Sequence, residues 1–204
     1  QAFAGGKPGV AKQIEGEVGA FGAYGMTASG AIYYCRCAPQ AGSDIKIASL
    51  DLSTGRFTSP PADAVQQYVG TNSQPSWSAD GKSFLYRTQR PRQDPMLAIQ
   101  DVASGEVREL RPKLMQLGDP RWSPDGRSIA VIGRDFQNQF GYYRIDLATG
   151  KASPMIIFPP GSTLGPMGPE SSWSSDGRKF YYRRQLRGVQ IIFAELDVES
   201  RQER

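Results

Sequence analysis

A short motif of two strands around a tight turn recurs along this chain, and it constrains the fold more than any other feature. The motif reads Trp-Ser-x-Asp-Gly followed by an apolar strand, and its full copies begin at Trp77, Trp122 and Trp173. A degenerate copy has Met26 in the tryptophan's place, so the four positions recur at intervals of 51, 45 and 51 residues. Repeats of this period are typical of propellers and solenoids.

Each copy continues with the same order of elements. An apolar strand such as Phe84-Leu85-Tyr86 follows the Asp-Gly turn, and a polar loop then leads to a third strand. The third strand ends in a second turn of the form Asp-[Leu/Val]-x-[Ser/Thr]-Gly, whose glycine can take the left-handed conformation of a hairpin turn. The last copy has Arg201 where that glycine is expected, so we expect that turn to be distorted or frayed.

Four antiparallel strands in a unit of about 45 residues make one propeller blade, so the sequence predicts an all-β propeller of four-stranded blades. The predicted propeller spans 19–204 and follows a tail at 1–18. Its predicted blades are 19–60, 74–111, 119–158 and 170–197. Because the last blade lacks an obvious outer strand, the tail segment Lys12 to Val18 is predicted to close the ring as that strand.

Composition restricts the chemistry that the chain can perform. It contains no histidine, which excludes Ser-His-Asp and Cys-His catalysis and histidine metal sites. It also lacks the Gly-x-Ser-x-Gly elbow of serine hydrolases and a glycine-rich phosphate loop. Cys35 and Cys37 lie two residues apart in a predicted strand, a spacing at the limit of disulfide geometry. We therefore predict no catalytic activity, no cofactor and no metal for this chain.

The residues of the repeated motif are predicted to be structural. A tryptophan that keeps the same place in every repeat occupies a packing position, and a turn aspartate more often bonds its own backbone than it binds Ca²⁺. The motif residues are Trp77, Asp80, Gly81, Trp122, Asp125, Gly126, Trp173, Asp176 and Gly177.

One charge pattern lies outside the repeat. In an up-and-down blade the second-to-third loops and the inter-blade connections share one face, here called the loop face, and the short turns share the opposite turn face. Eight loop-face arginines are opposed only by Asp94 and Asp135, although the whole chain has a net charge of +4. They form either a solvated rim that discourages edge pairing or a binding surface for an acidic protein or peptide. The arginines are Arg36, Arg87, Arg90, Arg92, Arg134, Arg183, Arg184 and Arg187.

Together, the two turn motifs resemble the WD40-like repeat of TolB-type β-propellers, and the resemblance covers nearly the whole chain. It is strong in the three copies that begin with tryptophan and loose in the copy at Met26. The resemblance implies a binding or scaffold module and a periplasmic or otherwise extracytoplasmic location. Such propellers usually have six blades. The four seen here leave open a small closed ring, an arc of a larger propeller, or self-association that completes one.

Three kinds of function fit these observations. The first, which we predict, is a non-catalytic module that binds a protein or peptide partner through the loop face. The second is an accessory or sensor domain of a larger enzyme or regulator, such as a peptidase, kinase or signalling protein, that gates substrates. The third is a module that binds a small ligand in the central channel. No nucleic acid partner is expected, because basic residues interleaved with exposed aromatics are not evident in the loops. No membrane insertion is expected either, because no apolar run approaches the length of a span.

Overall fold

The computed structural model describes residues 3–4, 7–8, 23–26, 31–38, 42–65, 71–90, 93–162, 170–186 and 190–204. Side chains are described over 44–65, 71–90, 93–162, 170–183 and 192–204. The predicted closing segment at 12–18 lies outside these residues, so its role stays a prediction. Within the described ranges there is no helix, and so none that is long and apolar enough for a membrane crossing.

Four antiparallel sheets follow one another along the chain, besides a two-stranded pair of β1 (Phe3–Ala4) and β2 (Lys7–Pro8). The first sheet contains β3 (Ala23–Met26), β4 (Ala31–Ala38), β5 (Gly42–Asp51), β6 (Arg56–Phe57) and β7 (Ala62–Asp63). The second contains β8 (Thr71–Trp77), β9 (Ser83–Gln89), β10 (Met96–Asp101) and β11 (Val107–Leu110). The third contains β12 (Gln116–Trp122), β13 (Ser128–Arg134), β14 (Phe140–Asp146) and β15 (Ala152–Ile157). The last contains β16 (Ser171–Trp173), β17 (Lys179–Leu186) and β18 (Gln190–Asp197).

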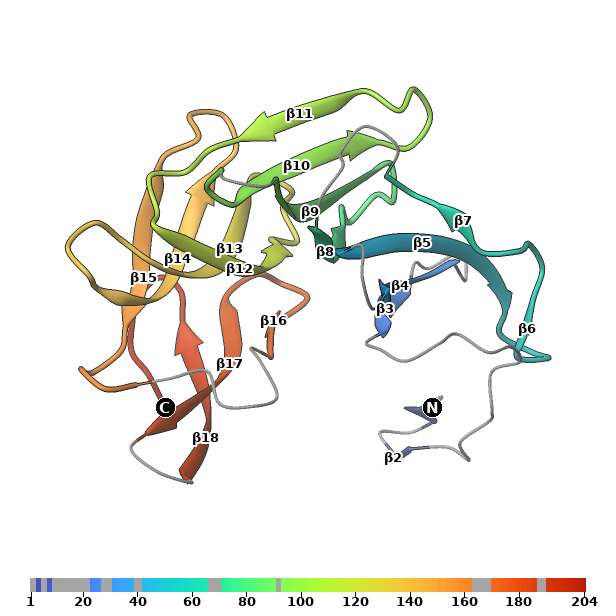
Figure 1. Ribbon diagram of the computed structural model, residues 1–204. Coiled ribbons are helices and arrows are strands. Elements are labelled where there is room, and N and C mark those ends of the chain that lie inside the picture. The colour runs from blue at the N-terminus through green and yellow to red at the C-terminus, as the bar shows by residue number, and fades with distance from the viewer. Residues whose placement is uncertain are drawn as a thin grey trace.

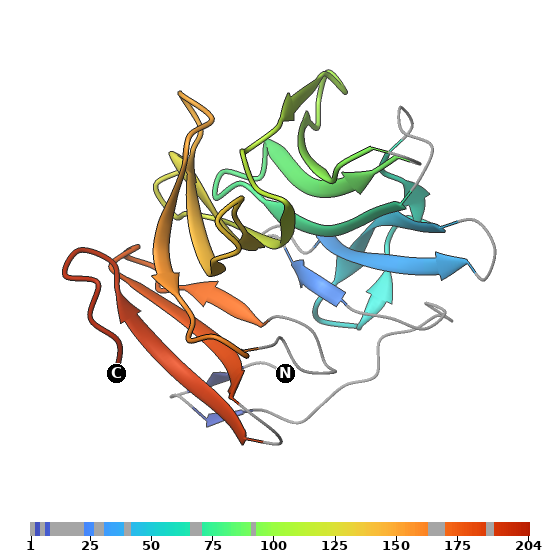
Figure 2. The ribbon, with the colours of Figure 1, turned by 60° about the vertical axis from the view of Figure 1, so that its left-hand side comes forward.

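The four sheets are arranged in an arc whose inner strands are β3, β8, β12 and β16 (Figure 1). Strands pair with their neighbours in chain order, except that β7 pairs with β5, and each inner strand contacts the inner strand of the next sheet. In the turned view of Figure 2 the β16–β18 sheet lies at one end of the arc, next to the third sheet. The predicted all-β propeller architecture, built from four-stranded antiparallel blades, is confirmed.

The Asp-Gly turn owes its shape to hydrogen bonds within the motif. In the third sheet the Ser123 hydroxyl donates to the Asp125 carboxylate over 2.6 Å and accepts from the Ser128 amide over 3.0 Å. Gly126 closes the turn: its amide donates a hydrogen bond to the Ser123 carbonyl, and its φ is 68°. Equivalent bonds surround Asp80 and Asp176. The motif aspartates therefore act on their own turns.

The second turn tolerates arginine in place of glycine. At Asp101 the carboxylate accepts from the amide and hydroxyl of Ser104, and Gly105 has a φ of 71°. Arg201 takes the same conformation, with a φ of 58°, and its amide donates to the Asp197 carbonyl over 2.8 Å. The expected distortion is wrong, although a side chain in the left-handed region costs about 1–2 kcal/mol. After this turn Glu203 pairs with Leu196, so a fourth strand begins beside β18.

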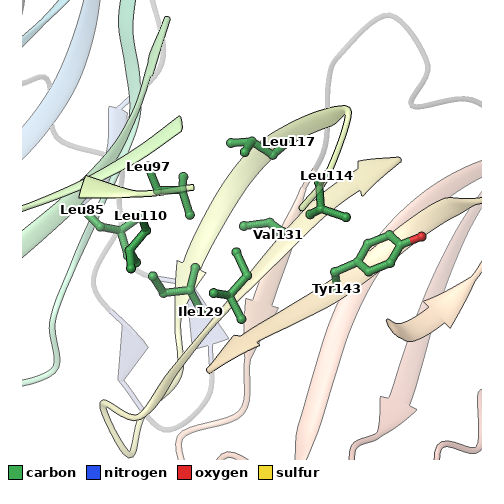
Figure 3. Close-up of a cluster of buried hydrophobic side chains, with 9 residues drawn as sticks. Leu85, Leu97, Leu110, Leu114, Leu117, Ile129, Val131 and Tyr143 are labelled. Atoms are coloured by element: carbon green, nitrogen blue, oxygen red, sulfur yellow. The ribbon is translucent and has the colours of Figure 1, made fainter. Parts of the chain in front are cut away.

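Apolar side chains fill three seams between consecutive sheets. Because side chains alternate along a strand, β9 directs Phe84 and Tyr86 into the first seam and Leu85 into the second. The second seam joins Leu85 and Leu97 to residues of the third sheet such as Val131 (Figure 3). The third seam joins the third sheet to the last through Ala130, Ile132, Tyr142, Phe180 and Tyr182. The tryptophans at 77, 122 and 173 pack against the first, second and third seams respectively.

The turn aspartates predict acid sensitivity. Hydrogen bonds from Ser53 lower the pKa of Asp51 from 3.8 to about 2, and similar bonds lower the pKa of the other turn aspartates. A carboxyl with a lowered folded pKa contributes stability above its unfolded pKa and loses it as the pH falls toward the folded pKa. We expect the free energy of unfolding, measured in urea at graded pH, to fall between about pH 5 and pH 2. A free energy that stays constant over this range would contradict this account of the turns.

The seams predict a large cost for truncating a buried seam residue. Leu97→Ala should lower the free energy of unfolding by about 2–5 kcal/mol, because it leaves a cavity between two sheets that cannot fully close. Val102→Ala is the matched control, since Val102 lies in a turn and is 47 % exposed, and should cost under about 0.5 kcal/mol. Both are measured by urea unfolding. Equal losses for the two variants would show that the seam does not carry the stability.

Candidate functional site

A groove opens on the loop face between the second and third sheets. It has a volume of about 430 Å³. Its polar lining comes from Gln74, Arg87, Gln89 and Gln116, and its apolar lining comes chiefly from Met115 and Phe140. Met115, in the β11–β12 connection, is 48 % exposed, and Phe136 in the β13–β14 loop is 68 % exposed. This loop-face groove therefore joins amide and guanidinium donors to accessible apolar surface.

Arg87 ties one wall of the groove to the other. Its Nε donates to the Leu117 carbonyl of the next sheet over 3.0 Å, and its Nη2 donates to the Gln89 side chain over 2.7 Å. Burial lowers the pKa of its guanidinium, which nevertheless stays charged at neutral pH. Arg87 thus positions the β12 backbone, and only part of its side chain faces the groove.

The other predicted arginines do not form one free cluster. Arg90 pairs with Glu109 at 3.1 Å, and Arg183 is buried with a guanidinium nitrogen 4.0 Å from the Glu170 carboxylate. Arg134 donates to Asn138 in its own loop over 3.0 Å, and its guanidinium lies 5.0 Å from the centre of the Phe140 ring. Arg134 and Arg87 are thus the described arginines closest to the groove.

For four of the eight predicted arginines, the structure does not describe the side chain. Arg36 lies on β4 and Arg184 on β17, but their side chains are outside the described set, and Arg92 and Arg187 are outside the described residues altogether. Their part in a binding surface stays a prediction.

The inner strands hold the floor of the groove through a chain of polar contacts. Gln74 and Asp119 occupy equivalent bulges in β8 and β12, with φ values of 56° and 45°. The Gln74 side chain accepts from the Asp119 amide over 3.0 Å, and the Asp119 carboxylate accepts from the Ser171 hydroxyl over 2.6 Å. Arg121 pairs with Asp119 at 2.5 Å. Burial raises the pKa of the Asp119 carboxyl, while Arg121 and Ser171 act in the opposite direction.

The sequence prediction missed the apolar half of the groove. Met115 and Phe140 line the groove, and Phe136 lies in the β13–β14 loop before Phe140. All three lie in or beside polar loops, and the only signal was an apolar residue where a loop would ordinarily be polar. Among the described side chains no three His, Cys, Asp or Glu residues gather as metal ligands would. The arrangement suits an extended chain that offers backbone carbonyls to the glutamines, a carboxylate to the arginines and an apolar side chain to Met115.

Comparison with known proteins places this fold. No protein-family model matches the chain. TolB from Acinetobacter baumannii has a TM-score of 0.67 and 21 % identity, over 85 % of this chain and 40 % of that one. The propeller domain of the trilobed protease from Pyrococcus furiosus has a TM-score of 0.54 and 12 % identity, over 88 % of this chain and 54 % of that one. A curated relative, the uncharacterized peptidase YuxL of Bacillus subtilis, is 37 % identical over 57 residues, which are 28 % of this chain and 9 % of YuxL.

Four-stranded blades set around a common centre define a β-propeller arc. Its repeats have the TolB-like fold that the motifs indicated. The chain spans 40 % of the TolB chain and a small share of YuxL. Such a fold is compatible with a binding module or with an accessory module of a larger protein.

The contacts of the arginines predict that Arg87 and Arg134 differ in their structural roles. Arg87→Ala should lower the free energy of unfolding by about 1.5–3 kcal/mol, because it removes a charged donor to a partly buried carbonyl. Arg134→Ala should lower the free energy of unfolding by less than about 1 kcal/mol, because Arg134 contacts only its own exposed loop and the Phe140 ring. Urea unfolding measures both. If Arg87→Ala cost no more than Arg134→Ala, Arg87 would be a free surface charge, as the sequence alone allows.

Proposed function

We propose that this chain is a non-catalytic binding module that recognises an acidic, extended segment of a protein partner in the loop-face groove. The observation that carries the proposal is the groove itself, where guanidinium and amide groups lie beside the exposed side chain of Met115. The loop between β13 and β14, which both line the groove, adds the exposed side chain of Phe136. Exposed apolar residues inside a polar surface mark interaction sites. If the arginines formed only a solvated rim, the exposed apolar residues beside them would have no explanation.

Acidity of the partner is supported by the charges near the groove. Arg87 lines the groove, and Arg134 lies against the ring of its lining residue Phe140. Asp135, next to Arg134 in the chain, accepts from the amides of Gln137 and Gln139, and Asp119 is paired with Arg121. Arginine binds carboxylates through two parallel hydrogen bonds and is more weakly hydrated than lysine, so it loses its water at a smaller cost. Such charges raise the association rate more than the affinity, and salt weakens the effect.

An accessory role in a larger enzyme is the second candidate. It is supported by YuxL, which is named a peptidase, and by the propeller domain of a protease. In that case the loop-face groove would select or hold segments of a substrate for a catalytic domain elsewhere. Both candidates place recognition in the same groove, and they differ in whether a catalytic domain shares the polypeptide.

An array of extended peptides graded in net charge tests the proposal. Peptides that combine carboxylates with one large apolar residue should bind best, and their association should slow as salt rises. Met115→Ser with Phe136→Ser should weaken binding about tenfold or more, and Arg134→Gln should reduce the association rate at low salt. Val102→Ser and Arg127→Gln on the turn face are matched controls and should leave binding unchanged.

Two outcomes would contradict the proposal. Binding that persists unchanged in the Met115 and Phe136 double variant would place recognition elsewhere. A preference for neutral or basic peptides, or for single-stranded nucleic acid over the acidic peptides, would rule out the acidic partner.

A further inference from the structure

Arg87 is a partly buried charge without an acidic partner. Burial lowers the pKa of its guanidinium, and it makes no ion pair within the part of the chain that the structure describes. Two other arginines near the inner strands each face an acid. Arg121 pairs with Asp119 at 2.5 Å, and the buried Arg183 lies 4.0 Å from the Glu170 carboxylate. Because a partly buried charge without a counter-ion is costly, an anion that binds beside Arg87 is favoured.

Hydrogen bonds fix the position of the Arg87 guanidinium. Its Nε donates to the Leu117 carbonyl over 3.0 Å, and its Nη2 donates to the Gln89 side chain over 2.7 Å. Its Nη1 has two N–H groups and makes no hydrogen bond to any described residue. Since the guanidinium is planar and already held by two bonds, these remaining donors have a fixed position in the lining of the groove.

Gln74 supplies a second fixed donor. Its side-chain oxygen accepts from the Asp119 amide over 3.0 Å, and this bond determines that the NH₂ group of the side chain lies on the other side. That NH₂ group makes no hydrogen bond to the described residues. The oxygen of Gln89 is likewise engaged, because it accepts from Arg87. These three side chains therefore offer donors while their acceptors are in use, which suits a ligand that only accepts hydrogen bonds, such as a carboxylate.

Gly118 lies between the two donors on β12 and keeps a space open beside them. Arg87 binds the carbonyl just before Gly118, and Gln74 binds the amide just after it, so both side chains contact adjacent peptide units. A Cβ at Gly118 would lie 3.4 Å from the side-chain oxygen of Gln74 and 3.8 Å from its nitrogen. Any other residue at this position would thus fill the space next to the Gln74 amide. All three residues line the loop-face groove.

We propose that Arg87, Gln74 and the space over Gly118 form a carboxylate subsite of the loop-face groove. The Nη1 group of Arg87 and the NH₂ group of Gln74 donate to the oxygens of one carboxylate, and Gly118 leaves room for it. This inference rests on the function proposed for the groove and assigns the acid of the partner to one position in it. The carboxylate belongs either to the C-terminus of a peptide or to an acidic side chain, because both present the same two oxygens.

The composition of the subsite favours a carboxylate over a phosphate group. The subsite contains one cation and one neutral amide, whereas a phosphate group has a charge of about −1.5 to −2 at neutral pH and is best matched by a cluster of arginines. Met115 and Phe140 line the same groove. A carboxylate next to a large apolar side chain therefore matches both the polar and the apolar lining.

Three tripeptides test the proposal in nuclear magnetic resonance titrations of the nitrogen-labelled 204-residue chain. Ac-Ala-Ala-Leu has a C-terminal carboxylate, its C-terminal amide has none, and the amide of Ac-Ala-Glu-Leu has only a side-chain carboxylate. Both carboxylate peptides should shift the side-chain amide signals of Gln74 and the backbone amide signal of Gly118. The neutral peptide should bind at least about tenfold more weakly. The ratio of the two carboxylate dissociation constants shows whether the subsite prefers a chain end or a side chain.

Two variants alter the subsite and keep Arg87, which also stabilises the fold. Gly118→Ala fills the space with a methyl group, and the chain should still fold, because Gly118 does not have a left-handed φ and its Cβ meets no atom closer than 3.4 Å. Gln74→Glu keeps an oxygen for the Asp119 amide and replaces the donor by a second acceptor. Each variant should raise the dissociation constants of the carboxylate peptides at least about tenfold.

Arg127→Gln is the matched control for Gln74→Glu. Arg127 is exposed on the turn face, and its replacement changes the net charge by the same amount as Gln74→Glu. This variant should bind both carboxylate peptides like the wild type. Melting temperatures check that each variant is folded.

The outcomes separate the subsite from the function proposed for the groove. Carboxylate peptides that shift the signal of Met115 but bind both subsite variants as tightly as the wild type would overturn the subsite and leave the groove as a binding site. Equal binding of the neutral peptide, or tighter binding of inorganic phosphate than of either carboxylate peptide, would also overturn the subsite. If no carboxylate peptide shifted the signals of the groove residues, the subsite and the proposed function would both be wrong.

Discussion

Apolar burial on both faces of a sheet is the constraint on which the rest of this structure depends. β9 sends Phe84 and Tyr86 to one side and Leu85 to the other, and all three are fully or almost fully buried. A four-stranded sheet of this kind has no face suited to water, so it is stable only between two neighbours. The stability of the arc is therefore a property of its seams, as in other repeat proteins whose units contact only the adjacent units.

The same seams shape the candidate site. Gln74 and Asp119, the bulge residues of β8 and β12, link the second sheet to the third at the inner strands. Gln74 and Leu117 also line the loop-face groove, and Arg87 crosses it to the Leu117 carbonyl. The groove is thus built on the seam itself, and its width depends on how the two sheets pack. Binding there would be sensitive to the packing beneath it.

The repeat motif predicted the fold because its residues act locally. Asp125 and Gly126 make hydrogen bonds within their own turn, and Trp122 packs against one seam, so a pattern read along the chain contains most of the necessary information. The prediction for Arg201 was wrong, because the backbone hydrogen bonds of its turn, and not the identity of its side chain, determine the turn's conformation.

The candidate site could be predicted only in part, because it depends on contacts between sheets. The sequence marked Arg87 and Arg134 on one face but could not show that Arg87 bonds the next sheet. It also could not show that Met115 is exposed while Leu114, its neighbour, is buried in the second seam.

Native-state hydrogen exchange tests the central claim, that each sheet is stabilised by the sheets on either side. β13 and β17 are both second strands with a paired strand on each side, so their backbone hydrogen bonding is alike, but β13 lies between two seams and β17 beside one. The amides of β13 should exchange markedly more slowly than those of β17. Equal protection of the two strands would contradict the account, because it would show that a second seam adds nothing to the stability of a sheet.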